Sequence, residues 1–464
     1  MMASNYLSNK IGHVIGAPLL VLYLQVFLGS TAIAQNFTST WPEGQKREQG
    51  DTLNGVRTGE WTAWYDNGTT WSVGTYGEGE KIGLWKYWYR NGKKWSELNL
   101  VEGLCISWYQ NGAKEKEGSV KDRMNDGLWQ YWHPNAKLQK QVIYDKGVLN
   151  GDSKSWFDNG QLEFEGAYKK DQPHGNCVWF LEDGNKDMEG EMIEGKQQGQ
   201  WTFHHENGGK GSQGNFELGV QEGEWIYWYN NGKKLRNGTY VNGKRSGLWT
   251  IYYENGMVEH EGEYTDGKEH GVWKSWYECK KPCRGGIGAK KDEGTFTMGK
   301  IDGNWKGWYM NGKLRYDNSF KLNVKHGSWS RWHEDGAPES VGNYKDGLLD
   351  GAWSSWYICR MPCSEGQGQL KEQGAYSKNL KHGNWTYFFE DGNKYQEQGY
   401  INGRPNGKWL EWYEHGSQSV IGYYKNGVKT GKWTYFEPNG AKAYGMLFKE
   451  GKKIEDINFK NSGQ

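Results

Sequence analysis

Hydrophobic and polar positions recur through this chain with a period of 24 residues, most clearly between Gly247 and His270. That copy begins with Gly-x-Trp, runs through paired aromatic residues to Asn-Gly, and continues as a polar stretch containing Gly-x-Tyr and Gly-Lys. A fixed period of this length indicates a repeat architecture, in which one small motif is stacked many times. The first glycines of the repeats are Gly59, Gly83, Gly103, Gly127, Gly151, Gly175, Gly199, Gly223, Gly247, Gly271, Gly303, Gly327, Gly351, Gly383, Gly407 and Gly431.

Each repeat is predicted to form a β-hairpin. Asn-Gly stands between two alternating aromatic runs, and both residues accept the positive φ of a two-residue type I′ turn. With the turn placed there, Trp249 faces Gly262 and Gly247 faces Tyr264 across the hairpin. Each pair sets a large ring against a glycine, so the ring can cover bare backbone.

The predicted fold class is therefore all-β. Glycines recur too densely for helices with an apolar face. We expect tandem antiparallel β-hairpin repeats that form an elongated, curved single-layer sheet, a solenoid-like arrangement in which each hairpin contacts only its neighbours.

A second aromatic column stands out when positions are numbered from the first glycine of each repeat. Alternation places Trp at position 3 and Tyr at position 18 on one face, and the Thr, Lys and Glu residues on the other. The polar face also carries a large ring at position 6. This column either packs ring against ring or forms a ladder on which sugar rings stack. Its tryptophans are Trp64, Trp88, Trp108, Trp132, Trp156, Trp228, Trp276, Trp308, Trp332, Trp356 and Trp412.

Composition supports burial by aromatic rather than aliphatic side chains. The chain has 464 residues and is 35% hydrophobic but 16% aromatic, with 28 Trp, 30 Tyr and 69 Gly. Aromatic rings supply large buried areas, so low hydropathy does not indicate disorder here. The formal net charge of +1 gives no reason to expect nucleic acid or an anionic membrane as a partner.

The N-terminus predicts export. Lys10 precedes an apolar run from Val14 to Leu28, and Ala32-Ile33-Ala34 resembles a cleavage site, which is the layout of a signal peptide. We expect a signal peptide at 1–34, a degenerate leading segment at 35–58, sixteen hairpin repeats at 59–450, and a C-terminal cap or tail at 451–464. The mature chain is expected in the periplasm, or secreted to the cell surface, with no membrane insertion after cleavage.

The six cysteines fall into two groups. Cys105 and Cys177 take position 3, where Trp usually stands, and are expected to be buried small hydrophobic residues. Four cysteines lie in two hairpin loops that are longer than the others, and in an exported protein each loop is expected to close a local disulfide. These residues are Cys279 with Cys283, and Cys359 with Cys363.

No catalytic or metal site is predicted. His174, His270, His326 and His382 all end a repeat, so they are read as turn residues of the repeat. Phosphate-binding loops, nucleophile elbows and metal motifs are absent from the sequence. We therefore expect a protein without enzymatic activity, cofactor or bound metal.

The stretch from Gly262 to Gly271 resembles the MORN repeat, and the W-x-x-W-Y-x-N-G half resembles the MORN variant of bacterial YwqK-type antitoxin-like proteins. The resemblance implies consecutive hairpins and a binding or scaffold role. The leading expectation is an exported interaction scaffold for protein partners. A polysaccharide-binding aromatic ladder is the alternative, and an antitoxin or immunity-type partner of a toxin is the second. Exposed edge strands also predict self-association.

Overall fold

The computed structural model describes residues 34–279, 288–358 and 368–459. They divide into a first body that ends at Met124 and a second body that begins at Asn125. Strands account for all the regular structure of the described residues, and no helix occurs among them. The predicted all-β hairpin repeat is confirmed. The predicted signal peptide lies outside the described residues except for Ala34.

The first body contains eight strands, and β9 begins at its last residue. Residues 35–58, expected to be a degenerate leading segment, form a hairpin in which Phe37 pairs with Gly50 as Trp249 pairs with Gly262. The strands are β1 (Ala34–Thr40), β2 (Lys46–Leu53), β3 (Val56–Trp64), β4 (Thr70–Gly77), β5 (Glu80–Trp88), β6 (Lys94–Asn99), β7 (Gly103–Trp108) and β8 (Lys114–Lys121).

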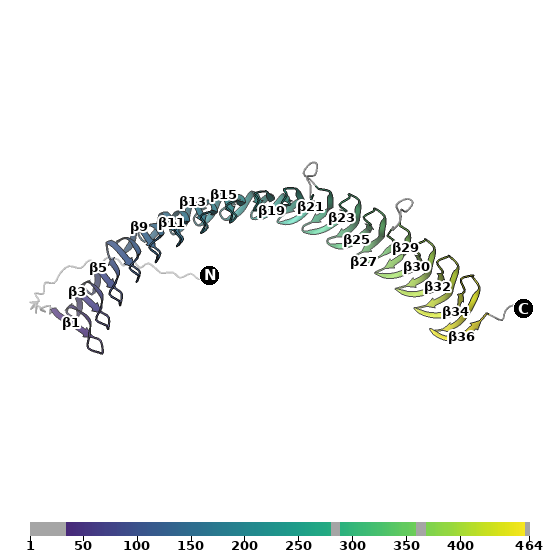
Figure 1. Cartoon of the computed structure of the whole chain (residues 1–464), viewed down its shortest axis with the longest axis horizontal. Coiled ribbons are helices and arrows are strands. Elements are labelled where there is room, and N and C mark those ends of the chain that lie inside the picture. Colours follow the sequence, from purple (N-terminus) through teal and green to yellow (C-terminus); the bar gives the residue numbers. More distant parts are fainter. Residues whose placement is uncertain (1–33, 280–287, 359–367, 460–464) are drawn as a thin grey trace, which may run out of the picture. The chain divides into compact units, whose positions relative to one another are not determined.

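The second body holds the remaining strands, which follow one another in sequence order (Figure 1). They are β9 (Met124–Trp132), β10 (Leu138–Asp145), β11 (Val148–Trp156), β12 (Leu162–Lys169), β13 (Gln172–Phe180), β14 (Lys186–Ile193), β15 (Lys196–His204), β16 (Lys210–Glu217), β17 (Val220–Trp228), β18 (Lys234–Val241), β19 (Lys244–Tyr252), β20 (Val258–Thr265), β21 (Lys268–Trp276), β22 (Lys290–Thr297), β23 (Lys300–Trp308), β24 (Leu314–Lys321), β25 (Val324–Trp332), β26 (Pro338–Lys345), β27 (Leu348–Leu349), β28 (Gly351–Trp356), β29 (Leu370–Ser377), β30 (Leu380–Phe388), β31 (Lys394–Ile401), β32 (Arg404–Trp412), β33 (Gln418–Lys425), β34 (Val428–Phe436), β35 (Lys442–Lys449) and β36 (Lys452–Asn458).

The loop inside each repeat is not the predicted two-residue turn. In the hairpin of β19 and β20, the Tyr253 amide donates to the Met257 carbonyl and the Gly256 amide donates to the Tyr253 carbonyl, each at 2.8 Å. Gly256 has a φ of 88°, whereas Asn255 does not take a positive φ and instead accepts the Met257 amide through Oδ1 at 2.9 Å. The prediction of a type I′ turn at Asn-Gly is therefore wrong, because only the glycine is left-handed.

Type I′ turns occur at the other end of the hairpins, between one repeat and the next. Asp266 and Gly267 have φ values of 51° and 78°, and they separate the paired residues Thr265 and Lys268. Two positive φ angles in a two-residue connection define this turn. The sheet therefore alternates a longer loop at one edge with a tight turn at the other.

The predicted register is nevertheless confirmed. Trp249 pairs with Gly262 and Gly247 pairs with Tyr264. The longer loop shifts the pairing next to it by one residue, so that Tyr252 pairs with Val258 and not with Glu259. A bulge before the next pair restores it.

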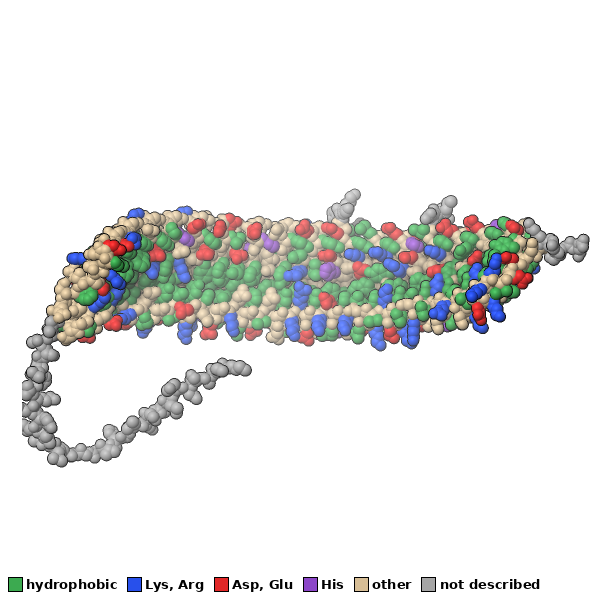
Figure 2. All heavy atoms as spheres, turned by 90° about the horizontal axis from the view of Figure 1, so that it is seen from below, with side chains coloured by type: hydrophobic (Ala, Val, Ile, Leu, Met, Phe, Trp, Pro, Cys, Tyr) green, Lys and Arg blue, Asp and Glu red, His purple; other side chains and the backbone are tan. Residues whose placement is uncertain are grey.

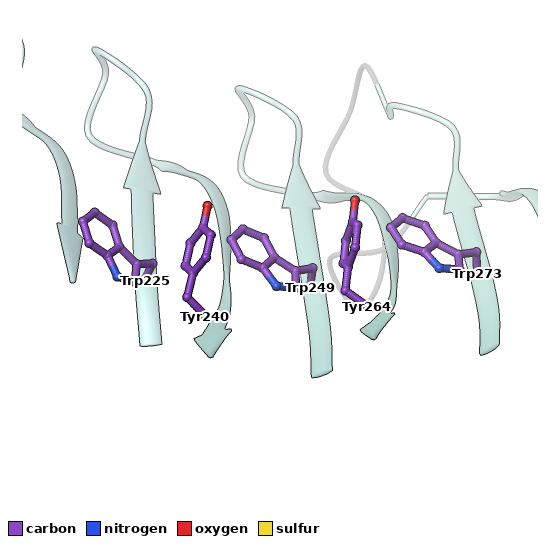
Figure 3. Packing of buried hydrophobic residues seen from close by; sticks show 5 residues of the cluster. All are labelled: Trp225, Tyr240, Trp249, Tyr264 and Trp273. Carbon is purple, nitrogen blue, oxygen red and sulfur yellow. The ribbon is translucent and has the colours of Figure 1, made fainter. Parts of the chain in front are cut away.

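Tryptophans at position 3 form the core of the sheet. Trp201, Trp225, Trp249 and Trp385 are almost fully buried. In the second body, tryptophans and tyrosines of successive strands alternate as Trp225, Tyr240, Trp249, Tyr264 and Trp273 (Figure 3). The surface with position-3 tryptophans is called the tryptophan face below, and the surface with position-6 residues is called the column face.

Most of these rings cover a glycine, but not the glycine of their own hairpin. A Cβ added at Gly238 would lie 2.2 Å from Cδ2 of Trp249, so the ring of Trp249 rests on the strand before it. The indole Nε1 of Trp249 also donates to the Thr239 carbonyl at 3.1 Å. The expectation that the ring shields Gly262 is therefore corrected: Gly262 lies beneath Trp273.

Candidate functional site

The position-6 tryptophans all lie at the same structural place, since each is the last residue of its strand. All eleven are half-buried, so their rings are neither enclosed nor fully in solvent. In neighbouring repeats, the position-6 residues stand on alternate strands, about 9.6 Å apart along the sheet. With Trp132 aside, none of them makes a ring contact with another aromatic side chain in the described part of the chain. The other ten rings therefore do not stack on one another.

Backbone carbonyls of the column residues accept hydrogen bonds from the loop of the preceding repeat. The Tyr253 hydroxyl donates to the Trp276 carbonyl at 2.8 Å, and the Tyr309 hydroxyl donates to the Trp332 carbonyl at 2.8 Å. The donor is the position-7 residue of the preceding repeat in each case. These bonds satisfy carbonyls beside the loop and fix the spacing of neighbouring repeats.

Lysines fill the space between rings of the column. The ammonium of Lys290 lies 4.8 Å from the centre of the Trp308 ring, and that of Lys94 lies 5.6 Å from the Trp108 ring. Lys94 also pairs with Glu97 at 2.8 Å. Cation–π contact and ion pairing thus alternate with half-exposed rings along this face.

The cysteines agree with the sequence prediction where they are described. Cys105 and Cys177 are free and buried, and burial raises the pKa of both thiols. Cys279 is disulfide-bonded, and its carbonyl accepts a hydrogen bond from Asn255 Nδ2 at 3.2 Å. The predicted partner Cys283, and both Cys359 and Cys363, lie outside the described residues, so the two predicted pairs stay predictions.

Histidines and acidic residues do not gather. Within residues 34–279, 288–358 and 368–459, no three His, Cys, Asp or Glu side chains come together as metal ligands do. His204 and His205 have separate partners: His204 Nε2 lies 3.4 Å from Glu189 Oε1, and His205 Nε2 lies 2.9 Å from the Trp228 carbonyl. Desolvation lowers the pKa of His260, which lies over Trp273.

A feature missed from the sequence is a hollow of about 570 Å³ on the tryptophan face of the second body. It lies where the row of position-3 tryptophans is interrupted at Ser153 and Cys177. The sequence signal was present, because Ser153 and Val142 both depart from the repeat. The lining residues are Tyr131, Gln139, Lys140, Tyr144, Ser153, Ser155, Glu163, Phe164, Tyr168 and Trp179.

Figure 2 shows a face of the second body with a band of hydrophobic side chains and charged residues along its borders. On the tryptophan face, positively charged groups lie on the rings: the Arg245 guanidinium is 4.7 Å from the Trp249 ring, and that of Arg236 is 4.2 Å from the Tyr227 ring. No helix long and apolar enough to cross a membrane is found among the described residues.

Comparison with known proteins identifies the repeat. Six segments match the model of the MORN repeat variant, at residues 81–101, 149–170, 221–242, 245–266, 325–346 and 381–402. No curated relative matches the chain. Among solved structures, the chain resembles the crystal structures of TcdB2-TccC3-Cdc42 and of TcdB2-TccC3, with 11% and 12% identity and TM-scores of 0.15 and 0.14. Each alignment includes 90% of this chain but only 24% and 25% of the two solved chains. The chain therefore spans about a quarter of their length.

Proposed function

We propose that this protein is a non-enzymatic, exported repeat scaffold that binds protein partners through its tryptophan face. The six matches to the MORN repeat variant support a binding or scaffold role. The observation that carries the proposal is the composition of that face, where Tyr, Trp and Phe rings lie beneath arginine and lysine side chains over many repeats. Aromatic residues and arginine are the residue types enriched where proteins bind one another.

A matched pair of variants tests this proposal. Tyr227→Ala with Arg236→Ala removes a half-buried ring and the guanidinium that lies on it, while leaving the buried Trp225 and Trp249 in place. Trp228→Ala, at the next residue, alters the column face instead. Both proteins should keep the circular dichroism spectrum of the natural chain.

The chain from Gln35 to the C-terminus is immobilised and exposed to exported proteins of the source cell. Each captured protein is purified and its affinity is measured. We expect a partner whose Kd rises at least tenfold in the tryptophan-face variant and stays within twofold for Trp228→Ala. The proposal is wrong if no exported protein binds saturably, or if the two variants bind every partner equally.

Polysaccharide binding at the column is the second candidate, and one observation favours it. The column tryptophans are half-exposed and stand apart, with lysine and glutamate side chains between them. Separate rings bordered by polar groups suit stacking against successive sugars. Titration with wall and capsular polysaccharides, followed by tryptophan fluorescence, should give a saturable change that Trp276→Ala, Trp308→Ala and Trp332→Ala together abolish. No saturable change with any of these polysaccharides would exclude this candidate.

A further inference from the structure

The repeat that begins at Gly151 has no aromatic ring at position 3, where thirteen of the sixteen repeats place a tryptophan and two others place Cys105 and Cys177. Elsewhere in the second body, Trp249 stands between Tyr240, at a ring distance of 5.2 Å, and Tyr264, at 6.1 Å (Figure 3). Ser153 occupies the place that corresponds to Trp249. Tyr144 and Tyr168 are the tyrosines that correspond to Tyr240 and Tyr264.

The backbone beneath the missing ring, called the floor of the hollow below, is covered by a valine side chain. Val142 stands where Gly238 stands in the comparison repeat, and it is 1% exposed. A valine there fills the space next to the backbone that an indole would cover, and Ser153 is buried beside it. The vacancy is therefore confined to the outer layer, between the tyrosine side chains.

The walls of the hollow are aromatic. The Phe164 ring lies 5.1 Å from the Trp179 ring and 6.1 Å from the Tyr168 ring, and the planes are tilted by 51° and 67°. Tyr131 and Tyr144 line the same hollow. Rings at several angles around one vacancy offer flat apolar surfaces to a ligand.

Polar groups complete the lining. Ser155 Oγ donates to Glu163 Oε2 at 2.8 Å, and Gln139 and Lys140 border the same hollow. Glu163 keeps further lone pairs for a ligand, and Gln139 offers both a donor and an acceptor. The one lysine and the one glutamate balance in charge, so the hollow as a whole is neutral.

These features together identify a class of ligand. Sugar rings present C–H groups on their faces and hydroxyls around their edges, which matches aromatic walls bordered by a carboxylate, an amide and an ammonium. An acyl chain would bury these polar groups without partners, at a cost of about 1–3 kcal/mol each. The volume of about 570 Å³ lies within the ~300–1,000 Å³ of small-molecule sites.

We propose that the hollow around Ser153 binds neutral sugar residues of an oligosaccharide. The inference stands apart from the protein scaffold and from the column, because it uses residues of the tryptophan face only. A free polysaccharide and the glycan of a glycoprotein present the same rings, and the test below includes both.

The probes are neutral gluco-, galacto-, manno- and xylo-oligosaccharides of two to six residues, with oligogalacturonides as acidic counterparts. Binding to the chain from Gln35 onward is measured by calorimetry and by saturation transfer from protein to ligand. A glycoprotein, before and after enzymatic deglycosylation, forms the last arm. We expect at least one neutral oligosaccharide to bind saturably.

The decisive variant restores the repeat. Val142→Gly with Ser153→Trp recreates the pair seen at Gly238 and Trp249, so the new ring should occupy the hollow with the fold preserved. We expect saturable binding to be lost. Glu163→Ala leaves Val142 and Ser153 unchanged and serves as a second variant in case the restored pair does not fold. It should weaken binding at least tenfold. Met310→Ala, at an exposed side chain outside both the hollow and the column, should leave binding within twofold. The column variant, Trp276→Ala with Trp308→Ala and Trp332→Ala, shows whether the same sugar needs the column instead.

Each contrary outcome overturns the proposal. Absence of binding by every neutral probe refutes the sugar site, and binding of oligogalacturonides alone refutes the neutral class. If the column variant abolishes binding while both hollow variants retain it, the sugar lies on the other face. A scaffold that binds proteins would be unaffected by these results, so the two proposals can fail separately.

Discussion

Replacing Gly238 by alanine should destabilise the sheet through one ring. The added Cβ would lie 2.2 Å from Cδ2, 2.4 Å from Cε2 and 2.5 Å from Cγ of Trp249. Because Cγ lies on the Cβ–Cγ axis, rotation about that bond cannot remove the contact with Cγ. Rotation about Cα–Cβ can remove it, but carries the ring out of its site. Trp249 is 1% exposed and its Nε1 is bonded to the Thr239 carbonyl.

The size of the effect follows from two limits. Overpacking of a core usually costs about 1–3 kcal/mol, and loss of a buried tryptophan costs about 3–5 kcal/mol. Because the Trp249 ring can avoid the new methyl group only by leaving its site, we expect Gly238→Ala to lower the free energy of local unfolding by about 3 kcal/mol. This corresponds to a change in a local opening equilibrium of about a hundredfold.

Native-state hydrogen exchange on the full mature chain is the suitable assay. Repeat arrays open locally and need not unfold in one step, so a single melting temperature would mix many events. The amides of β18 and β19 should exchange about a hundred times faster in the Gly238→Ala protein, whereas those of β30 and β31 should be unchanged.

A double-mutant cycle isolates the clash. In a Trp249→Ala background the new methyl group meets no indole, so Gly238→Ala should cost less than about 0.5 kcal/mol there. Equal costs in the two backgrounds would show that the glycine is needed for its backbone alone. A cost below about 0.5 kcal/mol in the natural background would refute the close packing itself.

Three further outcomes are expected. Tyr253→Phe removes the hydrogen bond from the hydroxyl to the Trp276 carbonyl. It should lower the stability of the sheet by about 1 kcal/mol, measured by hydrogen exchange of the β21 amides. Tyr395→Phe, at an exposed side chain, is the control, and equal effects of the two substitutions would refute the role of the bond. Burial, with a hydrogen bond to a neighbouring tyrosine, raises the pKa of Tyr227 to about 12. The neutral phenol is therefore favoured by folding, so stability should be complete below about pH 10 and fall between about pH 10 and 12, with a smaller fall in Tyr227→Phe. N-terminal sequencing of the exported protein should begin at Gln35, and a mature chain that keeps the apolar run would contradict the signal peptide.

The hairpin register could be predicted, although the turn that produces it could not. Asn-Gly is compatible with two loops, and the choice of the longer loop depends on the Tyr253 backbone bonds, which sequence alone does not display. The longer loop and the bulge near Glu259 shift the pairing by one residue in opposite directions. Their effects cancel, so an incorrect turn led to correct pairs.

The glycine beneath Trp249 illustrates a second limit. Trp249 pairs with Gly262 on one side and lies over Gly238 on the other, and periodicity treats these two neighbours alike. The structure distinguishes them because the register shifts beside Gly247, where Thr239 offers its carbonyl to the indole. A rule based on one hairpin could not contain this information, since the acceptor belongs to the preceding repeat.

At position 6, the place of the residues in the repeat follows from the sequence, but their packing does not. The sequence located the column correctly in the repeat but could not decide between packing and exposure, because alternation gives a face and not the distance between rings. Trp132 aside, these tryptophans make no ring contact with another aromatic side chain among the described residues, and the lysines that lie over two of the rings come from the preceding repeats. What the column binds is a question of surface chemistry that the repeat pattern does not encode.

Departures from the glycine-and-tryptophan pair occur at several places in the chain. Where Gln398 replaces the glycine, Trp409 is half-buried and donates to Glu411 Oε1 at 2.8 Å. Trp353, which keeps Gly342 beneath it, is also half-buried and donates to Glu372 Oε1 at 3.2 Å. Where Ser153 replaces the tryptophan, the glycine gives way to Val142, which fills the floor. An indole at 153 would meet the valine side chain, and a glycine at 142 would leave bare backbone uncovered. The hollow is therefore a coordinated change at two positions on neighbouring strands, which preserves the sheet while opening its outer layer.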